Sequence, residues 1–124
     1  NKYRLSPIFD NGSSLFPQLN TDEKIDQVLN NQEEINMRIY KFPTSQVKYK
    51  EKKSSYYEII SSLEFEECNN ALVRITERAD LNKINQLIDL VEGISDKRKR
   101  FYKIIIKQRF EKILLESYQK LKSM

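Results

Sequence analysis

The sequence predicts a mainly α-helical chain with a short extended segment at its N-terminus. Apolar residues recur at three- and four-residue spacing over most of the 124 residues, which is typical of helices with one buried face. Side chains that cap helices precede several of these stretches. By contrast, the first residues contain a proline and a turn signal. We expect one domain around one core.

The N-terminal segment at residues 3–9 is expected to be extended. Pro7 disfavours a helix and restricts Ser6 to extended conformations. Asp10-Asn11-Gly12 then predicts a turn, because Gly12 can adopt a positive φ at little cost.

Helices are expected in most of the remaining chain. Residues 36–54 are the exception and look irregular, because they contain Phe42-Pro43 and the charged run 48–53. Gly93 is a suitable stop for the fourth helix. The five expected helices cover about residues 21–32, 56–68, 71–79, 81–92 and 96–121, with caps at Asn20, Ser55, Asn69 or Asn70, Asp80 and Ser95.

The composition excludes several kinds of site. The chain has no His, which removes Ser-His-Asp and Cys-His catalysis and histidine metal sites. One Cys cannot form an internal disulfide, and two distant glycines cannot form a phosphate-binding loop. We interpret Cys68 as an inert thiol and Glu64, Glu66 and Glu67 as surface residues. No apolar run could span a membrane, and we expect a cytoplasmic location.

Positive charge is concentrated at the C-terminal end. Residues 95–124 contain ten basic and three acidic residues, a net +7, whereas the whole chain carries +4. Such a segment attracts nucleic acid, phosphate or an acidic partner, although a solvated helix face is the favoured interpretation. Lys97–Arg100 lies at a helix start, where the helix dipole disfavours each cation by about 0.3–1 kcal/mol. Either a partner or screening by Asp96 and solvent offsets this cost, and screening is favoured.

The Asp10-Asn11-Gly12 turn has a second interpretation as a metal-binding turn. A carboxylate held at the end of an extended segment supplies the oxygen ligand that Mg²⁺ requires. The following glycine lets the backbone turn sharply beside a ligand. The tripeptide alone favours an ordinary β-turn, in which Asp10 bonds to its own backbone.

The residues around this turn favour the metal interpretation. The segment Leu5-Ser6-Pro7-Ile8-Phe9-Asp10-Asn11-Gly12-Ser13-Ser14-Leu15 resembles the metal-binding segment of the HipA-like serine/threonine protein kinases. Tyr40–Pro43 and Ile94–Tyr102, which leads to Gln108-Arg109, also resemble later segments of that family. The resemblance covers essentially the whole chain. It implies the helical C-lobe portion of a kinase-like fold, with the strand and metal-type turn in residues 1–19 and a helical subdomain in 20–124.

The resemblance also implies a function. The parent would be a kinase that uses ATP and Mg²⁺, with Asp10 as the metal ligand and Gly12 as the small turn residue. Ser13 and Ser14 would lie near the phosphates without an assigned role. The family's catalytic loop and nucleotide-binding lobe are not in the chain, so we assign no catalytic residue and expect neither kinase activity nor tight ATP or Mg²⁺ binding from this piece alone.

Partners and alternatives follow from the same resemblance. The first partner would be the missing N-terminal part of the kinase, and a protein substrate or an antitoxin-like protein would be another. Apolar surface left exposed by the missing part would favour self-association. One alternative is a stand-alone helical module that binds nucleic acid or an acidic protein through its basic C-terminal helix. Another is a degenerate kinase remnant that is kept for protein contacts.

Overall fold

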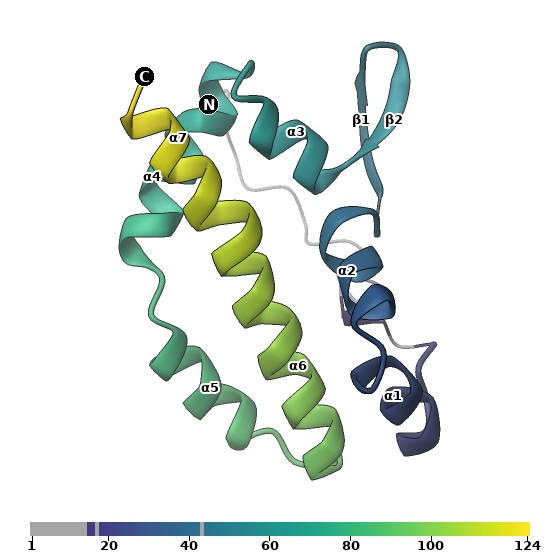
Figure 1. The fold of residues 1–124 in the computed structure, drawn as a ribbon. Helices are drawn as coiled ribbons and strands as arrows, with labels where there is room; N and C mark the ends of the chain where they lie inside the picture. The colour runs from purple at the N-terminus through teal and green to yellow at the C-terminus, as the bar shows by residue number, and fades with distance from the viewer. Residues whose placement is uncertain (1–14, 17, 43) are drawn as a thin grey trace, which may run out of the picture.

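The structure, a computed structural model, describes residues 15–16, 18–42 and 44–124 (Figure 1). Helices account for most of this part, which confirms the predicted fold class. The expected extended segment at 3–9 lies outside the described residues. The elements in order are α1 (Asp22–Leu29), α2 (Gln32–Tyr40), β1 (Thr44–Tyr49), β2 (Lys52–Ser55), α3 (Tyr56–Ser62), α4 (Glu66–Arg78), α5 (Leu81–Asp89), α6 (Asp96–Arg109), the π-helical stretch η2 (Phe110–Leu115) and α7 (Glu116–Lys122).

The C-terminal helix is the centre of the fold. Elements α6, η2 and α7 follow one another without a break, as predicted for 96–121, and the Ser95 hydroxyl caps the start by accepting from the Arg98 amide. The π-helical stretch, in which hydrogen bonds span five residues, was not predicted. Figure 1 shows α1 and α2 on one flank of α6 and α5 on the other, with α3 and α4 toward the α7 end.

The main core lies between α6 and the α1–α2 pair. Phe101 and Ile105 of α6 are completely buried, as is Ile25 of α1. Their spacing on α6 is four residues, so both side chains lie on the same helix face. The buried residues of this cluster are Phe16, Leu19, Ile25, Val28, Ile35, Ile39, Phe101, Ile105 and Ile113.

The N-terminal helices differ from the prediction. Thr21, not Asn20, caps α1, since its hydroxyl accepts from the Lys24 amide at 3.2 Å. Asn31 then caps a second helix by accepting from the amides of Glu33 and Glu34. The predicted helix over 21–32 therefore ends early, at Leu29, because an asparagine inside the stripe offers the backbone a new cap. The second helix, α2, extends to Tyr40 and so into the stretch from residue 36 that was predicted to be irregular.

A β-hairpin occupies much of the segment predicted to be irregular. Strands β1 and β2 pair antiparallel, with Tyr49 opposite Lys52 and an irregular register nearer Thr44. Lys50 and Glu51 form the two-residue turn, and both have positive φ, 54° and 65°. Turns of this kind usually carry Asn or Gly, so the sequence contained no standard hairpin signal here.

The helix predicted over 56–68 is interrupted. Helix α3 begins as expected after Ser55, which accepts from the Glu58 amide, but it ends at Leu63 in the left-handed conformation. Helix α4 then begins at Glu66, so Asn69 lies inside a helix instead of capping one. Its side-chain amide donates to the Leu63 carbonyl at 2.9 Å and fixes the corner between the two helices.

The second half follows the prediction more closely. Asp80 caps α5 by accepting from the amides of Asn82 and Lys83. Helix α5 ends at Asp89, and Gly93 adopts a φ of +85° in the turn that leads to α6. None of the helices in the described part of the chain is both long enough and apolar enough to cross a membrane.

Candidate functional site

The predicted metal turn precedes the described part of the chain. Asp10, together with Gly12, Ser13 and Ser14, lies outside the described residues, so its predicted role as a metal ligand stays a prediction. Within the described part, no three His, Cys, Asp or Glu side chains come together in a way that could hold a metal ion. The structure does describe Leu15, Phe16 and Leu19, through which the chain continues from the turn.

Phe16 fixes this segment to the core. It is 4% exposed, and its ring meets Phe101 edge-on at 6.5 Å between centroids and 65° between planes. The guanidinium carbons of Arg38 and Arg109 lie 5.2 and 5.4 Å from the Phe16 ring centre. Cations within about 6 Å of an aromatic ring are attracted to its electrons. The ring therefore joins α2 and α6 through one residue of the N-terminal segment.

The two arginines are themselves fixed by hydrogen bonds. Arg38 donates to the carboxylate of Glu34 at 2.8 Å, which balances one of the two positive charges. Arg109 donates to the carbonyl oxygen of Arg38 at 3.2 Å. Burial lowers the pKa of Arg109, but an arginine remains charged at neutral pH. The arrangement is a packed, charged clamp on Phe16.

A third arginine fixes the other end of the segment. The Arg98 guanidinium donates to the carbonyl oxygen of Leu19. We call Arg38, Arg98 and Arg109 the arginine clamp. The clamp and Phe101 hold Phe16 and Leu19 against α6 and α2. These two residues belong to the segment that follows the predicted turn in the sequence.

Sequence reasoning missed this clamp. Its signal was an arginine on the apolar stripe of the last helix, because Arg109 follows Ile105 by four residues and Arg98 precedes Phe101 by three. A basic residue in line with buried positions indicates a charge with an internal partner. The identity of that partner, Phe16, required the tertiary structure.

The predicted basic cluster Lys97–Arg100 is mostly used inside the molecule. Lys97 binds the Asp26 carboxylate at 2.5 Å, and this hydrogen bond raises the pKa of Lys97. Arg98 belongs to the clamp, and Lys99 donates to the Asp89 carbonyl at 2.9 Å. Arg100 is exposed. Three of the four cations therefore have partners within the molecule, and these contacts offset the cost that the helix dipole imposes. We had expected Asp96 and solvent to offset this cost by screening.

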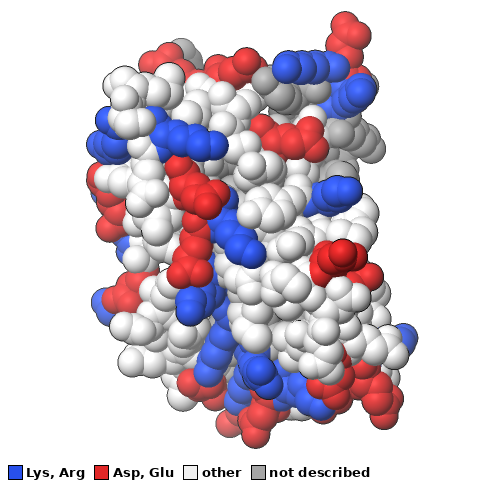
Figure 2. Space-filling model, in the orientation of Figure 1, with Lys and Arg blue, Asp and Glu red and all other residues white. Residues whose placement is uncertain are grey.

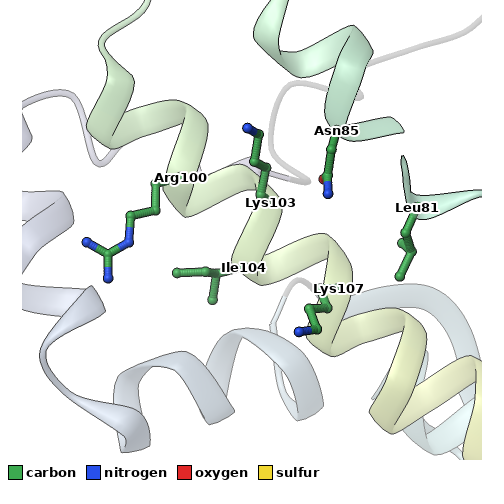
Figure 3. A pocket seen from close by; sticks show the side chains of 6 residues that line it. All are labelled: Leu81, Asn85, Arg100, Lys103, Ile104 and Lys107. Atoms are coloured by element: carbon green, nitrogen blue, oxygen red, sulfur yellow. The ribbon is translucent and has the colours of Figure 1, made fainter. Parts of the chain in front are cut away.

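Arg100 lines a groove between α5 and α6. The groove has a volume of about 170 Å³, and Figure 3 shows basic side chains from successive turns of α6 on one side and α5 side chains on the other. Lys103 extends toward α5 and binds the Asp89 carboxylate at 2.6 Å. The lining residues are Leu81, Asn85, Arg100, Lys103, Ile104 and Lys107.

Cys68 and the three glutamates singled out in the sequence lie on or next to α4. Cys68 is half-buried, and burial raises the pKa of its thiol, which lowers the thiolate fraction and the reactivity. Glu66 and Glu67 are exposed in the first turn of α4, and Glu64 is exposed just before it. None of them takes part in a site within the described residues.

Comparison with known proteins relates the chain to a protein kinase. No family model matches the chain. The chain is 40% identical over 114 residues to the serine/threonine-protein kinase CtkA of Helicobacter pylori (strain J99). This match covers 91% of the chain but 35% of CtkA, so the chain spans about a third of the length of this curated relative.

The structural comparison agrees with the sequence comparison. The crystal structure of a proinflammatory kinase CtkA from Helicobacter pylori superposes with a TM-score of 0.85 and 37% identity. The superposition covers 97% of this chain and 40% of that chain. The similarity therefore extends over nearly all of the helices and the hairpin described above, and it fits a C-terminal portion of the larger protein.

Proposed function

We propose that this chain, which matches a C-terminal portion of a HipA-like serine/threonine-protein kinase, acts as the distal part of a kinase C-lobe in ATP-dependent phosphoryl transfer. The observation that carries the proposal is the 40% identity along 91% of the chain, together with the shared fold. A match of this length includes the clamp and the core, not a single motif. We place the reaction in the cytoplasm, where a lone reduced cysteine is ordinary.

In this proposal the chain contributes a metal ligand and its support. Asp10 has the hard oxygen donor that Mg²⁺ prefers, and the hydroxyls of Ser13 and Ser14 are the same kind of donor. When bound, Mg²⁺ neutralises charge that develops on the transferred phosphoryl group. The arginine clamp holds Phe16 and Leu19, which follow this segment in the sequence, against α2 and α6.

The chain alone is proposed to be inactive. Phosphoryl transfer relies on several groups that position ATP and an acceptor hydroxyl together. Asp10 can provide one of these contacts. The base that receives the hydroxyl proton and the groups that hold the nucleotide are expected in the part of the kinase that the match does not include.

A chimera with CtkA tests the proposal. The segment of CtkA that matches this chain is replaced by the chain, and transfer of radiolabelled phosphate from ATP with Mg²⁺ is measured. We expect the chimera to be active, the 124-residue chain alone to be inactive, and Asp10→Asn in the chimera to reduce the rate at least about a hundredfold, because it removes a charged metal ligand. Asp96→Asn is the matched control, since Asp96 is an exposed carboxylate at the start of α6.

Two results would contradict the proposal. Equal activity of the chimera and its Asp10→Asn variant would remove the metal role of Asp10. A folded chimera without activity, with wild-type CtkA active in the same assay, would show that this chain cannot replace the matching kinase segment. Circular dichroism and size-exclusion chromatography establish that each variant is folded.

A further inference from the structure

The groove between α5 and α6 has unused positive charge. Arg100 and Lys107 line it, and neither has an ion pair or side-chain hydrogen bond within the described part of the chain. The neighbouring cations differ, since Lys97, Lys99 and Lys103 all bind acidic residues or carbonyls of α1 and α5. Figure 2 shows basic side chains gathered along the course of α6 on this face.

The groove also has an apolar part. Ile104 lies between Arg100 and Lys107 in sequence, and Leu81 of α5 lines the same groove (Figure 3). Asn85 adds an amide that can both donate and accept hydrogen bonds. The groove therefore presents a cation, an apolar surface and a second cation in succession along the helix.

This face of α6 points away from the clamp. Two residues along an α-helix are separated by about 200°, so Arg100 and Arg98 lie on nearly opposite sides of α6, as do Lys107 and Arg109. Arg98 and Arg109 hold Leu19 and Phe16, on the path to the predicted metal turn. A partner on the groove would not compete with the clamped segment.

The spacing of the two cations favours a helical ligand. Arg100 and Lys107 are seven residues apart, which corresponds to about 10.5 Å along α6. Two carboxylates seven residues apart on another helix have the same separation and lie on one face. Apolar residues three and four positions after the first carboxylate lie between them, opposite Ile104 and Leu81. None of the described residues that line the groove is aromatic, so none of them offers a ring on which a nucleic-acid base could stack.

We propose that the α5–α6 groove docks an acidic amphipathic helix of a separate partner protein, with carboxylates seven residues apart on Arg100 and Lys107 and an apolar side chain over Ile104 and Leu81. Docking of a helix into a groove through such periodic contacts is a common mode of peptide recognition. The interaction does not depend on phosphoryl transfer, and it is independent of the role of Asp10.

A designed peptide tests this proposal with the 124-residue chain. The probe is a fluorescent alanine-rich helical peptide with two glutamates seven residues apart and leucines three and four positions after the first. We expect saturable binding by fluorescence anisotropy. The Arg100→Glu/Lys107→Glu variant should bind about tenfold or more weakly, because two ion pairs become repulsive contacts. A peptide with two lysines in place of the glutamates should bind this variant and not the wild type.

The control variant has the same change in net charge at other places. Lys41 and Lys120 are exposed and lie outside the groove. The Lys41→Glu/Lys120→Glu variant should therefore bind the acidic peptide within about twofold of wild type, since distant surface charges are screened.

Three outcomes would overturn the proposal. The first is an equal loss in the groove and control variants, which would indicate attraction by net charge alone. The second is failure of the lysine peptide to bind the charge-reversed variant. The third is tighter binding of a single-stranded DNA oligonucleotide than of the peptide. If that binding also depended on Arg100 and Lys107, the groove would be a nucleic-acid site. Circular dichroism of each variant separates lost binding from lost structure.

Discussion

The two flanks of helix α6 are held in different ways. On the α1–α2 flank, Ile25, Val28, Ile35 and Ile39 are all at most 4% exposed. On the α5 flank, Ile88 is the buried apolar residue of the helix, and Leu87 and Leu90 are 65% and 75% exposed. The contacts from α5 to α6 include the ion pair and hydrogen bonds that centre on Asp89. One helix thus has a tightly packed flank and a polar, open flank.

The two flanks are suited to different tasks, one to holding a segment of the chain in place and the other to binding a partner. The packed flank holds the segment that leads to the predicted metal turn, where small displacements are costly for chemistry. The open flank carries the groove and two cations, Arg100 and Lys107, that have no ion pair within the described residues, and access matters more there than rigidity. The packed side should therefore set the global stability of the domain, and the open side should contribute less.

Matched isoleucine truncations test this comparison most strongly. We expect Ile25→Ala to lower the free energy of unfolding by about 3–4 kcal/mol, because it leaves a cavity in the main core. We expect Ile88→Ala to cost about 1–2 kcal/mol, since α5 is covered on one side and can move to fill the space. Urea denaturation followed by circular dichroism measures both values.

Leu90→Ala is the control for this pair. Leu90 is largely exposed, so its truncation should change the free energy of unfolding by less than about 0.5 kcal/mol. Equal losses for the two isoleucines would show that both flanks are packed alike and would remove the contrast between them.

The sequence predicted the packed flank of α6 better than the elements that pack on it. The positions of Phe101 and Ile105 followed from helical periodicity, and the caps Ser55, Asp80 and Ser95 are confirmed. Periodicity works here because buried positions on a helix must repeat every three or four residues. It cannot show where a helix is interrupted by a local competitor, as Asn31 does between α1 and α2.

The errors at the hairpin and the clamp have a common cause. Lys50 and Glu51 adopt positive φ without the residues that favour it, so tertiary structure must offset the local preference. The clamp depends on contacts between residues far apart in sequence, Phe16 with Arg38 and Arg109. Neither feature is visible in the local pattern. The resemblance of the segment around Asp10 indicated the kinase relationship, but not how that segment is held.

A second pair of variants compares opposite sides of α6 directly. Arg109→Gln removes a half-buried guanidinium from the Phe16 ring and from the Arg38 carbonyl. We expect a loss of about 1–3 kcal/mol in the free energy of unfolding, because packing and a hydrogen bond of a charged group are both lost. Lys107→Gln, on the exposed side, should change it by less than about 0.5 kcal/mol. Similar values for both variants, measured by urea denaturation, would contradict a structural role for the clamp.

The smallest expected effects come from the two ion pairs that link α6 to its flanks. Asp89→Asn should cost about 0.2–1 kcal/mol, as for an exposed pair, and the loss should shrink at high salt. Asp26→Asn should lower the melting temperature slightly through Lys97.

The second of these effects should also depend on pH. The hydrogen bond to Asp26 raises the pKa of Lys97 above its usual 10.5. Its stabilising contribution is therefore complete below about pH 10.5 and is lost as the pH rises through the raised value. The difference in melting temperature between wild type and Asp26→Asn should vanish at the most alkaline pH at which both remain folded. A difference that stays constant across this range would mean that Asp26 stabilises the fold independently of the charge of Lys97, and would contradict this ion pair as a link between α1 and α6.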